Sequence, residues 1–346
     1  MPIHHEGTQV RMLSEWFDKL HGTAMDTPVY VFQGEKEGGS VLIIGSAHPN
    51  EIGGTLSAFV LIENAVTESG TVYVIPYANR SASANTLPGD GTLQSFTLTT
   101  ASGEREFRYG SRLTDPVDQW PDPSVYTHFS SGQQLSGSDV RNLNRAFPGR
   151  PDGNITERAA YAITQLIITQ NIDLVIDMHE ASPEYPVVNA VVAHERAMPI
   201  ASYAVINMLS HFNVSLESSP VNLNGLSHRE LGDFTNAYVV LTETTNPSQG
   251  RLRGATTTKQ VLSGKDRFYV INAGLGMLYV PFDDMGHPVE ERVGRQLQGV
   301  IELISAFNNV HPERAIKLHN VPGYTELFTN ALAEDLGGTH LAKFLR

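Results

Sequence analysis

Val41-Leu42-Ile43-Ile44-Gly45-Ser46-Ala47-His48-Pro49-Asn50-Glu51 is the stretch around which the rest of the sequence is organised. Its apolar, β-branched first part predicts a buried strand, and residues 55–65 after it predict a helix with one apolar side. His48 and Glu51 therefore fall where a strand passes into a helix, which is where open α/β sheets bind ligands. An imidazole and a carboxylate at this spacing can both face one cation.

Composition limits the class of protein. The chain has 346 residues, of which 40% are hydrophobic and 18% charged, which is typical of a soluble globular protein. Its formal net charge of −13 argues against nucleic acid or an anionic membrane as the main partner. Without cysteine, any metal must be bound by His, Asp or Glu. Neither a secretion signal nor an apolar run of roughly 20 residues is visible, so we expect a cytoplasmic protein.

The order of predicted elements indicates an α/β fold. A strand at 41–44, a helix at 55–65 and a strand at 71–75 form the strand–helix–strand unit of a parallel pairing. Further strands are predicted at 29–32, 173–178, 187–193 and 236–242, and further helices at 13–20, 159–170, 197–212 and 289–304.

A long irregular segment at about 78–138 interrupts this order. It is rich in Gly, Pro, Ser, Thr and Asp but carries scattered aromatic residues. Such segments inside compact domains are usually functional or disordered, and the aromatics favour an ordered insertion that walls a cleft, with a small hairpin at 94–108. We expect one domain over residues 1–310 that contains this insertion, and a C-terminal extension over 311–346 without an assigned role.

Polar groups follow three of the predicted strands. His48 and Glu51 follow the first, His179 follows the strand 173–178, and Glu243 follows the strand 236–242. Three protein ligands plus an open position are typical of a catalytic zinc. We therefore predict His48, Glu51 and His179 as metal ligands and Glu243 as the general base.

Other assignments compete with this one. An isolated His-x-x-Glu is a weak signal, and a lone histidine is more often a hydrogen-bonded core residue than a ligand. His128, His194, His211 and His228 are alternatives, but none of them follows an apolar strand. Glu180 competes with Glu243 as the base, although in a continuing strand it would point away from His179. Asp177 lies on the same strand face as His179 and can support it.

Asn144 and Arg145 form a further candidate pair. The planar fork of an arginine binds a carboxylate at two points, and a neighbouring asparagine adds a donor. In so acidic a protein, such a pair near a cation would bind the anionic end of a substrate. A surface ion pair is the competing interpretation for Arg145.

Together these motifs resemble a known family. His48-Pro49-Asn50-Glu51, Leu143-Asn144-Arg145-Ala146-Phe147-Pro148-Gly149, Asp177-Met178-His179 and Thr242-Glu243-Thr244, in this order, resemble the zinc carboxypeptidase superfamily and its succinylglutamate desuccinylase/aspartoacylase branch. The resemblance implies a mixed, mostly parallel eight-stranded sheet flanked by helices. It also implies one zinc ion per chain on His48, Glu51 and His179, a substrate carboxylate held by Asn144 and Arg145, and Glu243 as base.

The sequence departs from the family pattern near the Asn-Arg pair. Asn142 stands where the family has an aspartate that orients a zinc-binding histidine. The family also has an arginine that polarises the scissile carbonyl. Arg112 and Arg141 are our first candidates for it, and Arg80 and Arg108 are weaker candidates.

The expected function is zinc-dependent hydrolysis of an amide bond next to a free carboxylate. Peptide-cleaving members carry a tyrosine some twenty residues before the base, and no tyrosine lies between Tyr203 and Tyr238. This favours deacylation of an N-acyl amino acid over a metallocarboxypeptidase that removes C-terminal residues from peptides. An inactive zinc- or ligand-binding protein of the same fold is the alternative from another class, and Glu243 argues against it. We expect a small-molecule or peptide partner with a carboxylate, no nucleic acid and no membrane, and we leave a homo-oligomer open.

Overall fold

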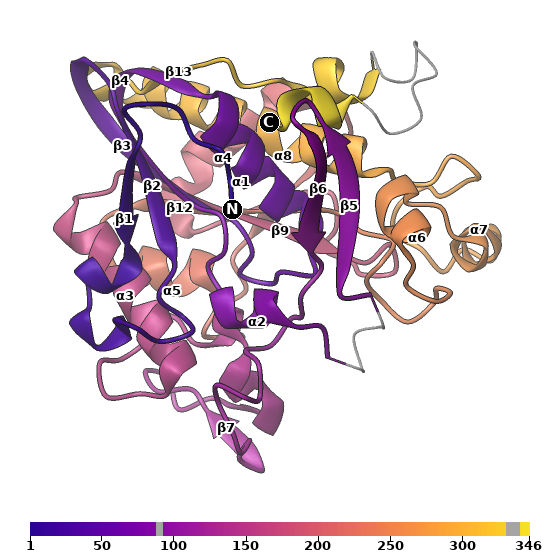
Figure 1. Cartoon of the computed structure of the whole chain (residues 1–346), viewed down its shortest axis with the longest axis horizontal. Coiled ribbons are helices and arrows are strands. Elements are labelled where there is room, and N and C mark those ends of the chain that lie inside the picture. Colours follow the sequence, from indigo (N-terminus) through magenta and orange to yellow (C-terminus); the bar gives the residue numbers. More distant parts are fainter. Residues whose placement is uncertain (88–92, 330–339) are drawn as a thin grey trace.

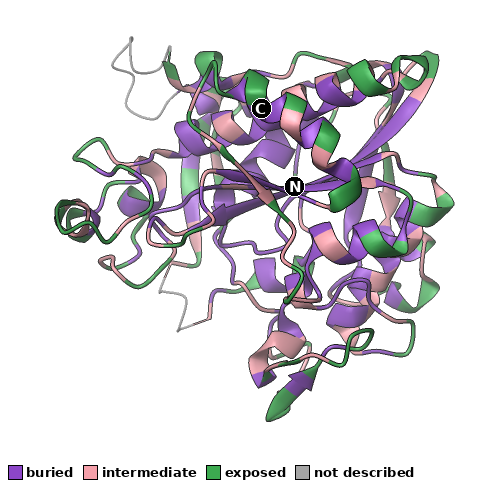
Figure 2. Ribbon diagram, turned by 180° about the vertical axis from the view of Figure 1, so that it is seen from behind, coloured by how far each residue is buried: buried purple, intermediate pink, exposed green. Residues whose placement is uncertain are grey.

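The computed structural model describes residues 1–87, 93–329 and 340–346. Residues 88–92 of the expected insertion and 330–339 of the expected C-terminal extension lie outside the described part. A central twisted sheet crosses the molecule with helices on both of its faces (Figure 1). Most strand residues are buried, whereas exposed residues lie on outer helix faces and loops (Figure 2).

The main sheet contains nine strands among the described residues. Eight follow the order β1-β2-β4-β3-β9-β12-β10-β11, and β13 pairs with β4 beside β2. Their bounds in sheet order are β1 Gln9–Met12, β2 Pro28–Gln33, β4 Val66–Ile75, β3 Lys36–Ile44, β9 Leu174–Ala181, β12 Tyr238–Thr245, β10 Ala190–Ala193 and β11 Ser215–Ser218, with β13 at Lys317–His319. Four of the pairings are parallel (β3 with β4 and β9, β9 with β12, β10 with β11) and the other four are antiparallel. The predicted mixed sheet is confirmed, with β13 as an additional short strand and half of the pairings antiparallel.

Helices cover the two faces of the sheet because its central strands are apolar on both sides. Val41 and Ile43 of β3 pack into one core cluster with α1, α4 and α8, while Leu42 and Ile44 pack into a second with α3 and α5. The helix bounds are α1 Ile52–Asn64, α2 Arg80–Ala84, α3 Ile155–Thr169, α4 Met198–Met208, α5 Ser227–Phe234, α6 Thr258–Ser263, α7 Arg267–Gly274 and α8 Val289–Val310. The predicted β3–α1–β4 unit is confirmed.

The expected irregular insertion contains two small hairpins. β5 Ser95–Thr100 pairs with β6 Gly103–Arg108, as the sequence predicted, and β7 Val125–Thr127 pairs with β8 Gln134–Ser136. Two short 3₁₀ helices, η3 Gly137–Arg141 and η4 Leu143–Arg145, then lead back towards the sheet.

Two sequence predictions are wrong in detail. Residues 13–20 form two short 3₁₀ helices, η1 Leu13–Glu15 and η2 Asp18–Leu20, instead of one amphipathic helix, because Phe17 between them is extended (φ −160°, ψ 99°). The strands expected to stop before His179 and Glu243 continue past both residues, because β9 and β12 stay paired up to Ala181 and Thr245.

Candidate metal centre and active-site pocket

The turn between β3 and α1 positions His48 and Glu51. The backbone N–H of Glu51 donates to the carbonyl of His48 at 2.9 Å, and α1 begins at the next residue, Ile52. Gly54 lets the first turn of α1 approach β9, since a Cβ on it would lie 2.4 Å from the Met178 carbonyl oxygen. This close packing brings the start of α1 to the strand that carries the second histidine.

His179 faces Glu51 from within β9. Its Nδ1 lies 2.9 Å from Oε2 of Glu51, and its Nε2 lies 3.0 Å from Oδ2 of Asp177. Asp177 and His179 share one face of β9 because they are two residues apart in a strand. The structure therefore brings His179 to Glu51 with Asp177 beside it, as the sequence predicted for this strand face.

His48 is held in a matching way. Its Nδ1 lies 2.9 Å from Oε1 of Glu51, while its Nε2 lies 2.8 Å from Oδ1 of Asn142. An amide oxygen only accepts hydrogen bonds, so Nε2 carries the proton and Nδ1 of the neutral ring is an acceptor. Asn142 thus orients His48 in place of the aspartate expected from the family pattern.

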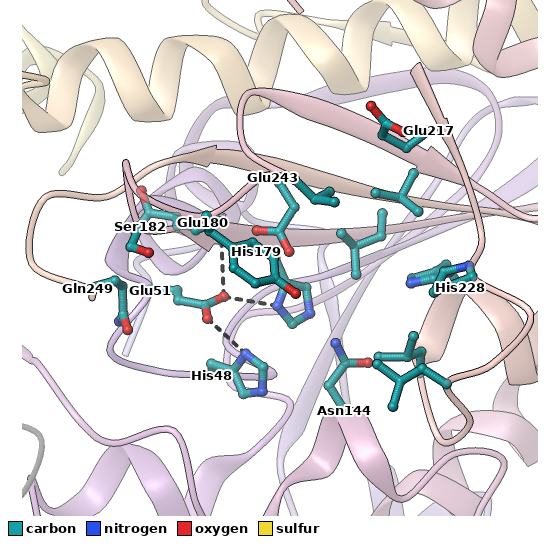
Figure 3. A pocket seen from close by; sticks show the side chains of 18 of the residues that line it. His48, Glu51, Asn144, His179, Glu180, Ser182, Glu217, His228, Glu243 and Gln249 are labelled. Carbon is teal, nitrogen blue, oxygen red and sulfur yellow. Dashed lines mark hydrogen bonds and ion pairs between the residues drawn. The ribbon is translucent and has the colours of Figure 1, made fainter. Parts of the chain in front are cut away.

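The two histidines and Glu51 form a buried group that can hold a metal ion. Their ligand atoms all lie within 4.8 Å of one another, and each of the three residues is buried (Figure 3). Both Nδ1 atoms lie 2.9 Å from a Glu51 oxygen. Two acceptors at this distance repel each other unless a proton or a cation lies between them. This donor set of two imidazoles and one carboxylate fits a zinc ion.

Burial and charge set the protonation of this group. Burial and the nearby Arg112 lower the pKa of His48 to about 4, so its ring is neutral at pH 7. Burial alone would lower the pKa of His179, but the carboxylates of Asp177 and Glu51 outweigh it and hold that pKa well above its ordinary value. Burial alone would raise the pKa of Glu51, yet the two histidines hold it well below its usual range. The Glu51 carboxylate between the two rings is thus the negative charge in this group that attracts a cation.

Glu243 lies beside this group. It pairs in register with His179 across the parallel strands β9 and β12, so both side chains project from the same face of the sheet. Its buried Oε2 accepts no hydrogen bond from the described residues. Burial raises the pKa of Glu243 to about 8. A carboxyl group with a free oxygen and a raised pKa has the properties of a general acid and base.

Asn144 and Arg145 face the same pocket from η4. The backbone N–H of Ser227 donates to Oδ1 of Asn144 at 2.8 Å, and Nη1 of Arg145 donates to the Asn144 carbonyl at 2.6 Å. Burial and the neighbouring Arg112 lower the pKa of Arg145. Within the described part of the chain, Arg145 forms no ion pair with a carboxylate. The surface-pair interpretation of Arg145 is therefore not supported by the geometry.

The two candidate carbonyl-polarising arginines occupy different places. Nη1 of Arg112 donates to Oε1 of Glu51 at 2.9 Å, so Arg112 lies at the centre. Arg141 is buried elsewhere and binds Asp122 through Nε and Nη2 at 2.7 and 2.8 Å. The fork of Arg141 is thus occupied, and Arg141 does not line the pocket. Of the weaker candidates, Arg80 donates to the Asp26 carbonyl, and Arg108 is exposed on β6.

The competing base and histidines have other partners. Glu180 points to the opposite face of β9 from His179, where Gly53 N–H and Asn246 Nδ2 each donate to its Oε2 at 2.9 Å and Arg292 lies 3.3 Å from Oε1. Three of the other histidines lie outside the pocket: His128 contacts the Phe147 carbonyl at 2.7 Å, His194 contacts Asp233 at 3.0 Å, and His211 is exposed. His228 lines the pocket, and its Nδ1 lies 2.9 Å from Ser219 Oγ.

A cavity of about 420 Å³ joins these groups, and sequence reasoning missed part of its lining. Ser182 and Tyr185 on the β9–β10 loop, Glu217 on β11 and Gln249 after β12 all line it. None of them stands in a recognisable motif. Tyr185 also means that the pocket contains a tyrosine, so the missing tyrosine between Tyr203 and Tyr238 does not separate deacylase from peptidase.

Comparisons with known proteins agree with the motifs. Residues 127–231 match the succinylglutamate desuccinylase/aspartoacylase catalytic domain. This segment contains Asn144, Arg145 and His179 but not His48, Glu51 or Glu243. The resemblance to the succinylglutamate desuccinylase/aspartoacylase branch is confirmed.

One curated relative and two solved structures are similar to the chain. Over 65 residues the chain is 34% identical to the N-alpha-acetyl-L-2,4-diaminobutyric acid deacetylase of Halomonas elongata. This matched segment is 19% of the length of each protein. A variant of the cell shape determinant protein Csd4 from Helicobacter pylori has a TM-score of 0.52 at 12% identity, over 89% of this chain and 60% of that one. Succinylglutamate desuccinylase/aspartoacylase from Rhodobacter sphaeroides has a TM-score of 0.46 at 15% identity, over 88% of this chain and 66% of that one.

These similarities cover only part of the known proteins. The chain spans less than two thirds of the length of each of the three. The likeness to Csd4 concerns the fold, which is a mixed sheet flanked by helices. Among the described residues, none of the helices has the length and apolar character needed to cross a membrane.

Proposed function

We propose that the protein is a zinc-dependent hydrolase that removes the acyl group from an N-acyl amino acid. The observation that carries the proposal is the pocket itself. The His48–Glu51–His179 group, the Glu243 carboxyl and the Arg145 guanidinium, which forms no ion pair with any described carboxylate, all face one cavity. The 34% identical segment shared with a deacetylase supports an amide bond to an acyl group as the target.

His48, Glu51 and His179 would hold the zinc ion through the two Nδ1 atoms and the Glu51 carboxylate. Zinc held there would supply Lewis acidity for a carbonyl and for a water molecule, and its charge would favour the ionised form of the neighbouring Glu243. Asn142 and Asp177 keep the opposite ring nitrogens occupied, so each histidine presents Nδ1 to the centre.

The chain's own residues account for the remaining chemistry. In the proposed reaction, Oε2 of Glu243 takes a proton from the attacking water and delivers it to the leaving nitrogen. The guanidinium of Arg112 stabilises the negative charge that develops on the carbonyl oxygen. Arg145 and the Asn144 amide bind the α-carboxylate and so align the amide bond with Glu243. The products are a free carboxylic acid and a free amino acid.

A hydrolysis screen tests the proposal. Purified protein with zinc is given N-acetyl and N-succinyl amino acids, the same compounds with the α-carboxylate converted to a carboxamide, and peptides with free C-termini. We expect release of amino acid from the N-acyl compounds with free carboxylates. Preferential cleavage of the peptides would favour the metallocarboxypeptidase alternative, and equal activity on the carboxamides would contradict the role of Arg145. Absence of activity with zinc bound would favour the inactive binding protein.

A further inference from the structure

The pocket extends well beyond the groups that the proposed reaction uses. Its far side is formed by β10, β11 and the segment that leads into α5, and Glu217 lies there, across the pocket from Glu51 (Figure 3). Ser182 and Gln249 line the opposite side, next to Glu180 (Figure 3). The cavity thus has one part on either side of the reacting groups.

The sheet register fixes the floor of the far part. Leu241 of β12 pairs with Val192 of β10, and Val192 pairs with Glu217 of β11. These three residues line the pocket in a row across adjacent strands. Adjacent strands lie about 4.8 Å apart, so the row leads roughly 10 Å across the sheet from Leu241 to Glu217. It is apolar for its first two residues and ends in a carboxylate.

The roof of this part begins at the proposed carboxylate anchor. Ser227 donates its backbone N–H to Asn144 Oδ1 at 2.8 Å, and Leu226 and His228 on either side of it line the pocket together with Leu223. An amino acid whose α-carboxylate is held by Asn144 and Arg145 therefore has this apolar part directly next to its Cα. In this placement its side chain would enter the far part, and the acyl group would lie on the side of Ser182 and Gln249.

The Glu217 carboxylate has no partner in the described part of the chain. Among the described residues, no hydrogen-bond donor or cationic side chain contacts its carboxylate. It is only partly exposed, and it stands on the edge strand at the end of an apolar floor. A carboxylate in such a place favours a cationic ligand, because a charge-assisted hydrogen bond would satisfy both groups.

We propose that Glu217 selects N-acyl amino acids with a long side chain that ends in a cation, of the lysine or ornithine type. The apolar floor of Leu241 and Val192 contacts the methylene groups, and Glu217 binds the terminal ammonium. A side chain of three or four carbons matches the extent of the row better than one of two carbons. This inference rests on the proposed function because it takes the α-carboxylate to be held at Asn144 and Arg145.

The test compares substrates that differ in one charge. Nα-acetyl-L-lysine and Nα-acetyl-L-norleucine, which lacks only the terminal ammonium, are hydrolysed by the zinc-loaded wild type, by Glu217→Gln and by Glu195→Gln. Glu195 is an exposed carboxylate outside the pocket and is the matched control. We expect the wild type and Glu195→Gln to prefer lysine by about tenfold to a hundredfold in kcat/KM. The lysine-to-norleucine ratio should fall to about one in Glu217→Gln.

A second measurement is independent of turnover. Calorimetry of the products L-lysine and L-norleucine binding to the same three proteins should show the same Glu217-dependent preference. A wild type that hydrolyses or binds norleucine as well as lysine overturns the inference, as does a preference that survives in Glu217→Gln. Hydrolysis of norleucine or glutamate derivatives without a preference for lysine would leave the proposed function intact. If no N-acyl amino acid is hydrolysed, the proposed function fails, and the binding preference alone decides the role of Glu217.

Discussion

The Nε2 atom of His48 lies 2.8 Å from Oδ1 of Asn142, so a neutral amide orients this histidine. We predict that Asn142→Ala weakens zinc binding by about 10- to 100-fold, because the ring loses the partner that directs Nδ1 to the centre. Competition with a chromophoric chelator measures the affinity. Asn207→Ala, on the surface of α4, is the control. Unchanged zinc affinity in Asn142→Ala would mean that packing alone orients His48.

The hydrogen bonds of Asn142 explain why an amide suits position 142 better than a carboxylate. Its Nδ2 donates to Oδ1 of Asp139 at 3.2 Å while its Oδ1 accepts from His48. An aspartate there would face Asp139 with like charge. We predict that Asn142→Asp lowers the free energy of unfolding by about 1 kcal/mol and that Asp139→Asn in the same chain restores most of it. Denaturant unfolding of the two single variants and the double variant tests this, and strictly additive effects would contradict it.

Removal of the metal should have two measurable effects. Protein purified without chelator should contain about one zinc per chain, and His179→Ala should lose it because one of three ligands is missing. Zinc at a hundredfold excess over its Kd should stabilise the wild type by about 3 kcal/mol. It should leave His179→Ala unchanged, whereas His194→Ala, outside the pocket, should behave as the wild type. Full zinc content in His179→Ala would contradict the assignment of His48, Glu51 and His179 as the zinc ligands.

Substitutions of Glu243 and Glu180, the two candidates for the base, should affect turnover and stability differently. Glu243→Gln should retain zinc and stability but lose about 10²- to 10⁴-fold in kcat, because the proton acceptor is gone. Glu180→Ala should instead lower the free energy of unfolding by about 3–5 kcal/mol, since it leaves the buried Arg292 without its carboxylate. Turnover and thermal unfolding of both variants decide the assignment. A fully active Glu243→Gln would move the base role elsewhere.

The part of the site that could be predicted from sequence is the part encoded locally. His48, Glu51 and His179 follow or end apolar runs, so pattern alone indicated that they meet at one edge of the sheet. The continuation of β9 past His179 was not predicted, because a strand that turns polar can still pair when its neighbour, β12, pairs in register with it. Phe17 broke the predicted first helix for a similar reason, since the spacing of its apolar neighbours is also met by two short turns.

The remaining site residues depend on tertiary contacts that carry no local signal. Arg112 and Arg141 could not be ranked, because the irregular chain between them decides which one reaches Glu51 and which one meets Asp122. Glu217 stands on a strand of four residues and belongs to no motif. Only the pairing of β11 with β10 brings it to the end of the apolar floor.

Substitutions of Arg145, Arg112 and Arg141 should have three different effects. Arg145→Ala should lower kcat/KM for a free α-carboxylate by about tenfold to a hundredfold and leave the carboxamide analogue unaffected, because the lost interaction is a charge-assisted hydrogen bond. Arg112→Ala should lower kcat by about 10²- to 10³-fold for both substrates, as expected for a group that stabilises the developing oxyanion.

Arg141→Ala supplies the contrast that separates binding from folding. Because Arg141 binds Asp122 and the Thr114 carbonyl away from the pocket, its loss should lower the free energy of unfolding by about 3 kcal/mol. At temperatures where the variant is folded, its kinetic constants should stay near those of the wild type. Steady-state kinetics on matched carboxylate and carboxamide substrates, together with denaturant unfolding, distinguish the three outcomes. If Arg145→Ala lowered kcat/KM for the carboxamide as much as for the carboxylate, the guanidinium would act on something other than the substrate's free carboxylate. That result would contradict the assignment of Arg145 as the carboxylate anchor.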